Sequence, residues 1–309
     1  MKKVAIIGAG AVGSHICAAG ILKNLPAEFL LVDLNENLET GEVLDLRDSL
    51  LFSDSKNVSG ANFGDEDLKN ADIFVITAGV AQKPGETRCE LLAKNAKILT
   101  AIRKNLGEIK KSAVVILVTN PVDVLTALAA QIFDLPRGNV LGTGTFLDSS
   151  RLRWHLAEKS GVHPKSVHGF VLGEHGDSEF VAWSGVRIGG KIPDFSEKEK
   201  VEIAEKTRRE AYEIIAKKGA TFFGIGATTA EIFAAIIADG KKVLPVSAVL
   251  RGEFGISEIA LGVPAVIGKS GVEKIWEIEL SPDEKEKLKN SAEKMRELFR
   301  SCPREQKEF

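Results

Sequence analysis

The sequence predicts an α/β protein in which a doubly wound parallel sheet is followed by an α+β half. Three observations support this prediction. A buried strand, a glycine-rich turn and a helix follow one another near the start, short apolar strands then alternate with helical segments to about residue 142, and the pattern changes beyond that point. Because 309 residues suffice for about two domains, we expect one domain at residues 1–142 and a second at 143–309.

The composition is that of an ordinary globular protein. Hydrophobic residues make up 44% and charged residues 27% of the chain, and the formal net charge is −2. A charge so close to zero gives no electrostatic reason to expect nucleic acid or an anionic membrane as a partner. Cys17, Cys89 and Cys302 are far apart and lack C-x-x-C spacing. We therefore expect a cytoplasmic protein without disulfides or a metal site.

The apolar run at residues 4–22 follows two lysines and so imitates a signal peptide or a membrane span. Glycines and polar residues interrupt this run, however. A buried strand at 4–7 and a helix that continues to about Lys23 explain it better. We therefore expect neither a targeting segment nor a membrane anchor in this run.

The turn between this strand and this helix reads Gly-Ala-Gly-Ala-Val-Gly at residues 8–13. Gly8 makes the turn, Gly10 lets the backbone approach a pyrophosphate, and Gly13 permits close packing of the helix on the strand. The helix N-terminus favours the negative charge of the phosphates. Glycines also mark simple turns, but here a strand precedes the motif and a helix follows it, which strengthens the prediction of a nucleotide site.

A second apolar strand, at residues 29–32, ends in Asp33. A carboxylate there would accept hydrogen bonds from ribose hydroxyls and repel a 2′-phosphate, which predicts NAD rather than NADP. Val12, within the glycine-rich turn, would flank the nucleotide. The alternative is a βαβ unit that binds no nucleotide.

The alternation continues as expected for a parallel sheet with crossover connections. Strands are predicted at 72–77, 113–118 and 139–141, and helices at 38–51, 89–110 and 122–133. We expect six strands in this sheet, with ligands at their carboxyl ends. The residues just past those ends, where a dinucleotide would run, are Gly79, Val80, Thr119, Asn120 and Thr143.

The connection at residues 78–88, Ala-Gly-Val-Ala-Gln-Lys-Pro-Gly-Glu-Thr-Arg, is predicted to be a surface loop. Gly79, Pro84 and Gly85 could act as hinges. The loop would bring Gln82 and Arg88 over the ligand edge of the sheet. A mobile lid that carries a cation to a reacting carbonyl is the functional interpretation, and a plain exposed loop is the alternative.

Asp148, Arg151 and His175 form the candidate catalytic group. Asp148 and Arg151 share a helix face because they are three residues apart, and His175 follows an apolar strand predicted at 167–172. An aspartate that holds a histidine raises its pKa and makes it a proton donor near neutrality, and a guanidinium can clamp a carboxylate with two hydrogen bonds. A buried Asp-Arg pair with an unrelated surface histidine is the alternative.

The second half of the chain has the mixed pattern of an α+β unit packed on the first half. Further strands are predicted at 186–188, 243–250, 259–267 and 272–275, and helices at 196–218, 220–239 and 282–300, followed by a frayed tail.

Together these motifs resemble those of the L-lactate/malate dehydrogenase family, and within it the bacterial L-lactate dehydrogenases. The resemblance covers essentially the whole chain and rests on GAGAVG at 8–13, AGVAQKPGETR at 78–88, VTNPVDV at 118–124, GTGTFLDSSRLR at 142–153 and GEHGDSE at 173–179. It implies a Rossmann-type NAD-binding domain followed by a substrate domain that reduces pyruvate reversibly to L-lactate.

The resemblance also implies roles for individual residues. His175 matches the acid/base that donates a proton to the pyruvate carbonyl as the NADH hydride arrives, and Asp148 matches the residue that orients its imidazole. Arg151 matches the group that binds the substrate carboxylate, and Arg88 matches the lid arginine that polarises the carbonyl. Further substrate contacts are implied for Asn120, Asp123 and Thr221, and further cofactor contacts for Ala101, Val118, Asn120 and Thr143.

The choice of substrate depends on Gln82. In malate-specific relatives this position resembles an arginine that pairs with the second carboxylate of oxaloacetate, which a neutral glutamine leaves without a counter-charge. The resemblance therefore implies an L-lactate dehydrogenase, with a malate dehydrogenase as an alternative. Ser150, Val181 and Phe254 depart from commoner choices in the family and leave open a larger 2-oxo acid, as in a hydroxyisocaproate-type dehydrogenase.

Two different classes of protein remain as alternatives. An NAD-dependent glycoside hydrolase would share the nucleotide fold, but the sequence has no Cys/His metal constellation. A non-catalytic NAD-binding protein is opposed by the intact set of Arg88, Asp148, Arg151 and His175.

Arg153 and His168 match positions that bind fructose 1,6-bisphosphate across a subunit interface in allosteric bacterial lactate dehydrogenases. A cation beside a protonatable histidine suits a phosphate, and surface charge without an effector is the alternative. The resemblance also implies a homotetramer.

Overall fold

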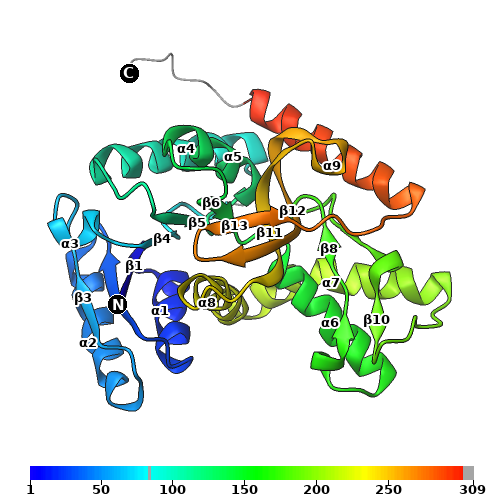
Figure 1. Cartoon of the computed structure of the whole chain (residues 1–309), viewed down its shortest axis with the longest axis horizontal. Helices are drawn as coiled ribbons and strands as arrows, with labels where there is room; N and C mark the ends of the chain where they lie inside the picture. Colours follow the sequence, from blue (N-terminus) through cyan, green and yellow to red (C-terminus); the bar gives the residue numbers. More distant parts are fainter. Residues whose placement is uncertain (83–84, 302–309) are drawn as a thin grey trace.

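The computed structural model describes residues 1–82 and 85–301. Its centre is a nine-stranded sheet in the order β13-β12-β11-β6-β5-β4-β1-β2-β3. In Figure 1, helices α4, α5 and α9 lie on one side of the strands and α1 and α8 on the other. No helix in the described part of the chain is both long and apolar enough to span a membrane. The predicted tail, which includes Cys302, lies outside the described residues.

The first half of the chain forms the parallel part of the sheet. Its strands are β1 (Lys2–Ile7), β2 (Ala27–Val32), β3 (Asn57–Gly60), β4 (Ile73–Ile76), β5 (Val114–Leu117) and β6 (Val140–Gly142). Its helices are α1 (Ala11–Leu22), α2 (Glu36–Asp48), α3 (Glu66–Lys69), α4 (Arg88–Leu106) and α5 (Val122–Ile132). The six strands pair in parallel in the order 3-2-1-4-5-6, so the predicted Rossmann-type doubly wound fold is confirmed.

The strands β4 and β5 are buried at every residue. Helices cover both faces of a parallel sheet, so its strands read as continuous apolar runs rather than alternating ones, and this is why the sequence revealed them. No sequence pattern predicts the strand β3, because in Asn-Val-Ser-Gly only Val58 is buried and one apolar residue gives no alternation.

The second half of the chain contributes helices and antiparallel strands. Its helices are α6 (Phe146–Ser160), α7 (Glu197–Lys218), α8 (Phe223–Ile237) and α9 (Pro282–Ser301). Its strands are β7 (Val167–His168), β8 (Val171–Leu172), β9 (Phe180–Val181), β10 (Arg187–Ile188), β11 (Lys242–Arg251), β12 (Ser257–Gly268) and β13 (Gly271–Ile275). The strand β11 pairs antiparallel with β6 through Ser247 and Gly142, so β11, β12 and β13 extend the same sheet.

Two predictions about this half need correction. The single strand predicted at 167–172 is two short strands, because the chain leaves the pair β7-β10 after His168 and enters the pair β8-β9 at Val171. His175 therefore lies in the connection between β8 and β9, not at the end of one long strand. The helix predicted from residue 220 begins only at Phe223, which leaves Thr221 in the loop between α7 and α8.

Candidate active site

A pocket of ≈ 510 Å³ lies beyond the carboxyl ends of β1, β2 and β4. Its lining includes the predicted cofactor contacts Gly8, Gly10, Val12, Gly13, Asp33, Gly79 and Ala101. The other predicted contacts are not in this lining but follow β4, β5 and β6 along the same edge of the sheet: Val80, Val118, Asn120 and Thr143.

The glycine-rich turn fits a dinucleotide. Gly8 has φ +107°, and a Cβ on Gly13 would lie 1.8 Å from the carbonyl oxygen of Gly8, so neither position has room for a side chain. A Cβ on Gly10 would meet nothing within 4 Å, which leaves the backbone open to a ligand. No side chain caps the N-terminus of α1 and its first turn holds no acidic residue, so the helix end can receive a phosphate.

Asp33 is fixed by the backbone around it. Its Oδ2 accepts from the N–H of Ala9 at 2.8 Å, and its Oδ1 accepts from the N–H of Asn35 at 2.9 Å. The carboxylate therefore stands at the end of β2 in the pocket, where a ribose would lie. These residues fit the dinucleotide that the sequence predicts.

Asn95, which no sequence motif singles out, connects two loops at this edge. Asn95 is 1% exposed on α4. Its side chain accepts from the N–H of Val80 at 2.8 Å and donates to the carbonyl of Asn120 at 2.7 Å. A polar residue among the buried Leu91, Leu92, Leu99 and Ile102 on one helix face was the signal available in the sequence.

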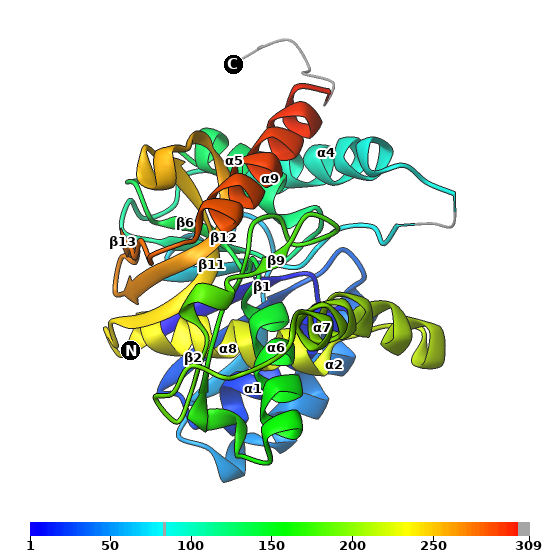
Figure 2. The same ribbon diagram turned by 90° about the vertical axis from the view of Figure 1, so that its right-hand side faces the viewer.

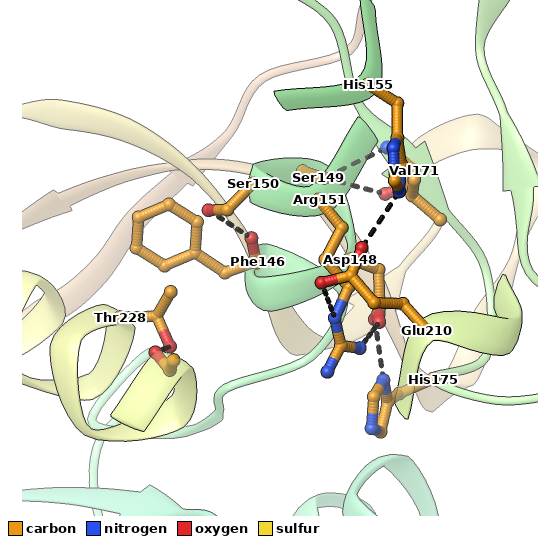
Figure 3. A network of polar contacts seen from close by, with 11 residues as sticks. Phe146, Asp148, Ser149, Ser150, Arg151, His155, Val171, His175, Glu210 and Thr228 are labelled. Atoms are coloured by element: carbon orange, nitrogen blue, oxygen red, sulfur yellow. Dashed lines mark hydrogen bonds and ion pairs between the residues drawn. The ribbon is translucent and has the colours of Figure 1, made fainter. Parts of the chain in front are cut away.

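The three candidate catalytic residues come together at the start of α6. His175 Nδ1 donates to Asp148 Oδ2 at 2.6 Å, and Arg151 Nη1 donates to Asp148 Oδ1 at 3.0 Å. Figure 3 shows Asp148 between the His175 ring and the Arg151 guanidinium. Because the carboxylate occupies Nδ1, the other ring nitrogen of His175, Nε2, remains for a substrate.

Asp123 holds the backbone of His175 rather than its ring. Asp123 Oδ2 accepts from the N–H of His175 at 2.7 Å, and Oδ1 accepts from Ser247 Oγ at 2.6 Å. Burial raises the pKa of Asp123 to about 6, against the effect of these hydrogen bonds. Ser247 lies on β11 and was not singled out in the sequence.

The electrostatics favour a protonated His175. The charge of Asp148 raises the pKa of His175 to about 9, although burial opposes this rise. Burial alone would raise the pKa of Asp148, but the charge and hydrogen bond of His175 and the charge of Arg151 outweigh burial and lower it. The arrangement can therefore donate a proton from an imidazolium beside a guanidinium that can hold a carboxylate.

Glu179 is a further buried acidic residue beside Asp148 and His175, and its place in the sequence predicts no role for it. Ligating atoms of Asp148, His175 and Glu179 lie within 4.8 Å of one another. Burial, followed by the charge of Asp148, raises the pKa of Glu179 to about 8. Both oxygens of Asp148 already accept from His175 and Arg151.

The start of α4 places Arg88 against the loop that carries His175. Thr87 and Glu90 form a reciprocal capping box that starts α4 at Arg88. Arg88 Nη1 pairs with Glu174, and Nη2 pairs with Asp177 at 2.9 Å. In the sequence both acids stand out only as parts of the GEHGDSE motif.

The remaining predicted residues are more peripheral. Figure 2 shows the described residues on either side of positions 83–84, between β4 and α4, extending away from the body of the molecule. Gln82 is exposed here and donates to the carbonyl of Glu86 at 2.8 Å. Pro84, a predicted hinge, lies outside the described residues. Arg153 lies on α6, where burial lowers its pKa, and His168 is exposed on β7, which contacts α6.

The doubly wound sheet, its dinucleotide pocket and the adjacent Asp-His-Arg group define a nucleotide-dependent oxidoreductase. Residues 2–142 match the model of the lactate/malate dehydrogenase NAD binding domain, and residues 145–302 match that of the lactate/malate dehydrogenase alpha/beta C-terminal domain. The chain belongs to the lactate/malate dehydrogenase family. NAD is its cofactor.

Similar proteins agree with this assignment. The chain is 43% identical to the L-lactate dehydrogenase of Kosmotoga olearia, covering 97% of this chain and 96% of that protein. It is 42% identical to that of Latilactobacillus sakei, covering 96% and 93%. The solved structure of the minor L-lactate dehydrogenase from Enterococcus mundtii in its ligand-bound form superposes with a TM-score of 0.93 at 38% identity, over 98% of this chain and 99% of that one.

Proposed function

We propose that this protein catalyses the reversible reduction of pyruvate to L-lactate. The observation that carries the proposal is the Asp148-His175 pair beside Arg151, at the edge of the sheet where the dinucleotide binds. When bound, NADH supplies the hydride. Arg151 holds the substrate carboxylate, His175 donates its Nε2 proton to the carbonyl oxygen, and Asp148 stabilises the imidazolium before the transfer.

Lid closure completes the site. Arg88 already contacts the acids that flank His175. In the closed lid its charge polarises the substrate carbonyl, and it acts most strongly once water is excluded. Asn120 and Thr221 are proposed as further substrate contacts, and Asp123 fixes the main chain of His175. Gln82 faces the substrate methyl without adding a charge, which favours pyruvate over oxaloacetate.

The assignment is tested by NADH consumption with pyruvate, oxaloacetate and 2-oxoisocaproate. We expect pyruvate to give the highest kcat/KM. A higher kcat/KM for oxaloacetate would instead identify a malate dehydrogenase, and a higher value for 2-oxoisocaproate would identify a hydroxyisocaproate-type enzyme. An absence of turnover with all three would point to a protein that binds NAD without catalysis.

The raised pKa of His175 predicts a pH dependence. Reduction needs the protonated imidazole, so kcat/KM for pyruvate should be level near neutrality and fall as the pH rises through about 9. For lactate oxidation, which needs the neutral imidazole, kcat/KM should rise over the same interval. Steady-state kinetics from pH 6 to pH 10 measure both profiles, and a midpoint near the ordinary histidine value of about 6.5 would contradict the role of Asp148.

The position of Asp33 predicts the choice between cofactors. Asp33→Ser should raise kcat/KM for NADPH relative to NADH by roughly tenfold or more, because it removes a carboxylate that repels the 2′-phosphate. Kinetics with both cofactors at a fixed pyruvate concentration measure the ratio. Asp54→Ser, which changes an exposed acid bonded to Asn24, is the control and should leave the ratio unchanged.

We also propose a homotetramer. Two large apolar side chains just after α2 support an assembly that covers them, because Leu51 is 86% exposed and Phe52 83%. Light scattering coupled to size exclusion should give a mass four times that of one chain. A monomer at micromolar concentration would contradict the proposal.

Regulation, domain division and location complete the proposal. Arg153 and His168 bind fructose 1,6-bisphosphate between subunits, and unchanged kinetics in its presence would refute this assignment.

A domain boundary after residue 142 is supported by the end of the last parallel strand there. The cysteine pattern supports a cytoplasmic location, as expected for an enzyme that uses the cellular NAD pool in glycolysis and fermentation.

A further inference from the structure

A second carboxylate and a second histidine lie behind Arg151. The Arg151 Nε lies 3.7 Å from Glu210 Oε1, and Glu210 Oε2 accepts from His155 Nε2 at 2.8 Å. Figure 3 shows the resulting chain of side chains from His155 through Glu210 and Arg151 to Asp148 and His175.

Two helices build this arrangement. Arg151 and His155 are four residues apart on α6 and so share a helix face, whereas Glu210 comes from α7, which packs against α6. Arg151 is 5% exposed. A buried guanidinium needs partners for its donors, and the two carboxylates lie on different edges of its plane, at Nη1 and at Nε. Together they set the direction in which the remaining donors point.

The remaining donors of Arg151 are those that a substrate carboxylate would use. A bidentate Arg-carboxylate pair requires the two planes to be aligned, so the orientation of the guanidinium matters as much as its charge. Glu210 is only partly buried and its contact with Nε is longer than a hydrogen bond. Such a flexible side chain can align Arg151 only if it is itself held in place, and His155 holds it.

We propose that Glu210 and His155 are positioning residues that orient Arg151 for the substrate carboxylate. The inference rests on the proposed role of Arg151 in binding a 2-oxo acid. Glu210 also has an opposite effect, because its negative charge repels an incoming carboxylate. The two effects differ in sign: loss of positioning raises the KM for pyruvate, whereas loss of repulsion lowers it.

The main test compares His155→Leu with His155→Gln. Leucine removes the donor to Glu210, and we expect the KM for pyruvate to rise about five- to tenfold while kcat stays within about twofold, since His175 and Asp148 are untouched. Glutamine keeps an N–H donor and should restore KM to within about twofold of the wild type. Glu210→Gln should raise KM in the same direction as His155→Leu.

Binding is measured separately with oxamate, a non-reducible isostere of pyruvate, titrated into the protein with NADH. Its Kd should follow the KM of each variant, whereas the Kd of NADH should not change. Glu213→Gln is the matched control, because Glu213 is an exposed acid on the same helix whose partner is Lys217; its KM should equal that of the wild type. Thermal unfolding of each variant checks that the fold is intact.

The inference is overturned if His155→Leu leaves KM unchanged or lowers it, if kcat falls as much as kcat/KM, if glutamine is as damaging as leucine, or if Glu210→Gln lowers KM. Failure of the proposed function is distinguishable from these results, because the wild type itself would then not reduce pyruvate. If the wild type is active and Arg151→Lys raises KM strongly but the His155 variants behave as the wild type, only the positioning role fails.

Discussion

Replacement of His175 by glutamine is expected to lower kcat for pyruvate reduction by about 10²–10⁴. A glutamine amide can hydrogen-bond to the carbonyl oxygen, but it cannot give up a proton at neutral pH. The alkoxide that forms as the hydride arrives would then lack its proton donor. Stopped-flow measurement of NADH oxidation in a single turnover separates this loss from any change in product release.

The control for this variant is His163→Gln. His163 is an exposed histidine that caps a short turn and accepts from the N–H of Lys165 at 3.2 Å, so its replacement should leave kcat unchanged. NADH should bind His175→Gln as it binds the wild type, because the pocket at β1 and β2 does not include residue 175. A His175→Gln enzyme that kept kcat within tenfold of the wild type would rule out this residue as the proton donor.

Replacement of Gln82 by arginine is expected to shift the preference from pyruvate toward oxaloacetate by about 10²–10⁴, measured as the ratio of the two kcat/KM values. A carboxylate enclosed without a counter-charge costs roughly 3–5 kcal/mol, and each tenfold in selectivity corresponds to about 1.4 kcal/mol. Arginine at position 82 supplies the missing counter-charge, and it places an unpaired guanidinium beside the methyl group of pyruvate. The substitution should therefore raise kcat/KM for oxaloacetate and also lower kcat/KM for pyruvate.

The control is Gln82→Met, which has a similar length and no charge. It should keep the preference for pyruvate, because it offers nothing to a second carboxylate. An unchanged ratio in Gln82→Arg would mean that residue 82 does not face the substrate in the closed lid. A gain for oxaloacetate in both variants would mean that pocket size, not charge, sets the selectivity.

The sequence by itself determined the parallel sheet, apart from β3, and its nucleotide edge. Strands buried on both faces must be apolar throughout, and the turn at Gly8 and Gly13 has no room for a side chain, so these features depend on local rules that a sequence displays. The pairing of Asp148 with Arg151 also follows from a local rule, because two residues that are three positions apart on a helix lie on the same face.

Only the tertiary structure decided which groups complete the site. Asp123 and Ser247 are 124 residues apart in the chain, and Glu210 reaches Arg151 from another helix. The antiparallel strand β11 joins the sheet through one residue pair, Ser247 with Gly142 of β6. A contact between strands so far apart in the chain produces no local pattern in the sequence. The hydrogen-bond partners of a polar side chain can be distant in the sequence. The sequence shows only which hydrogen bonds each side chain is able to donate or accept. Packing therefore fixed the partners of Arg151, of the His175 backbone and of Arg88.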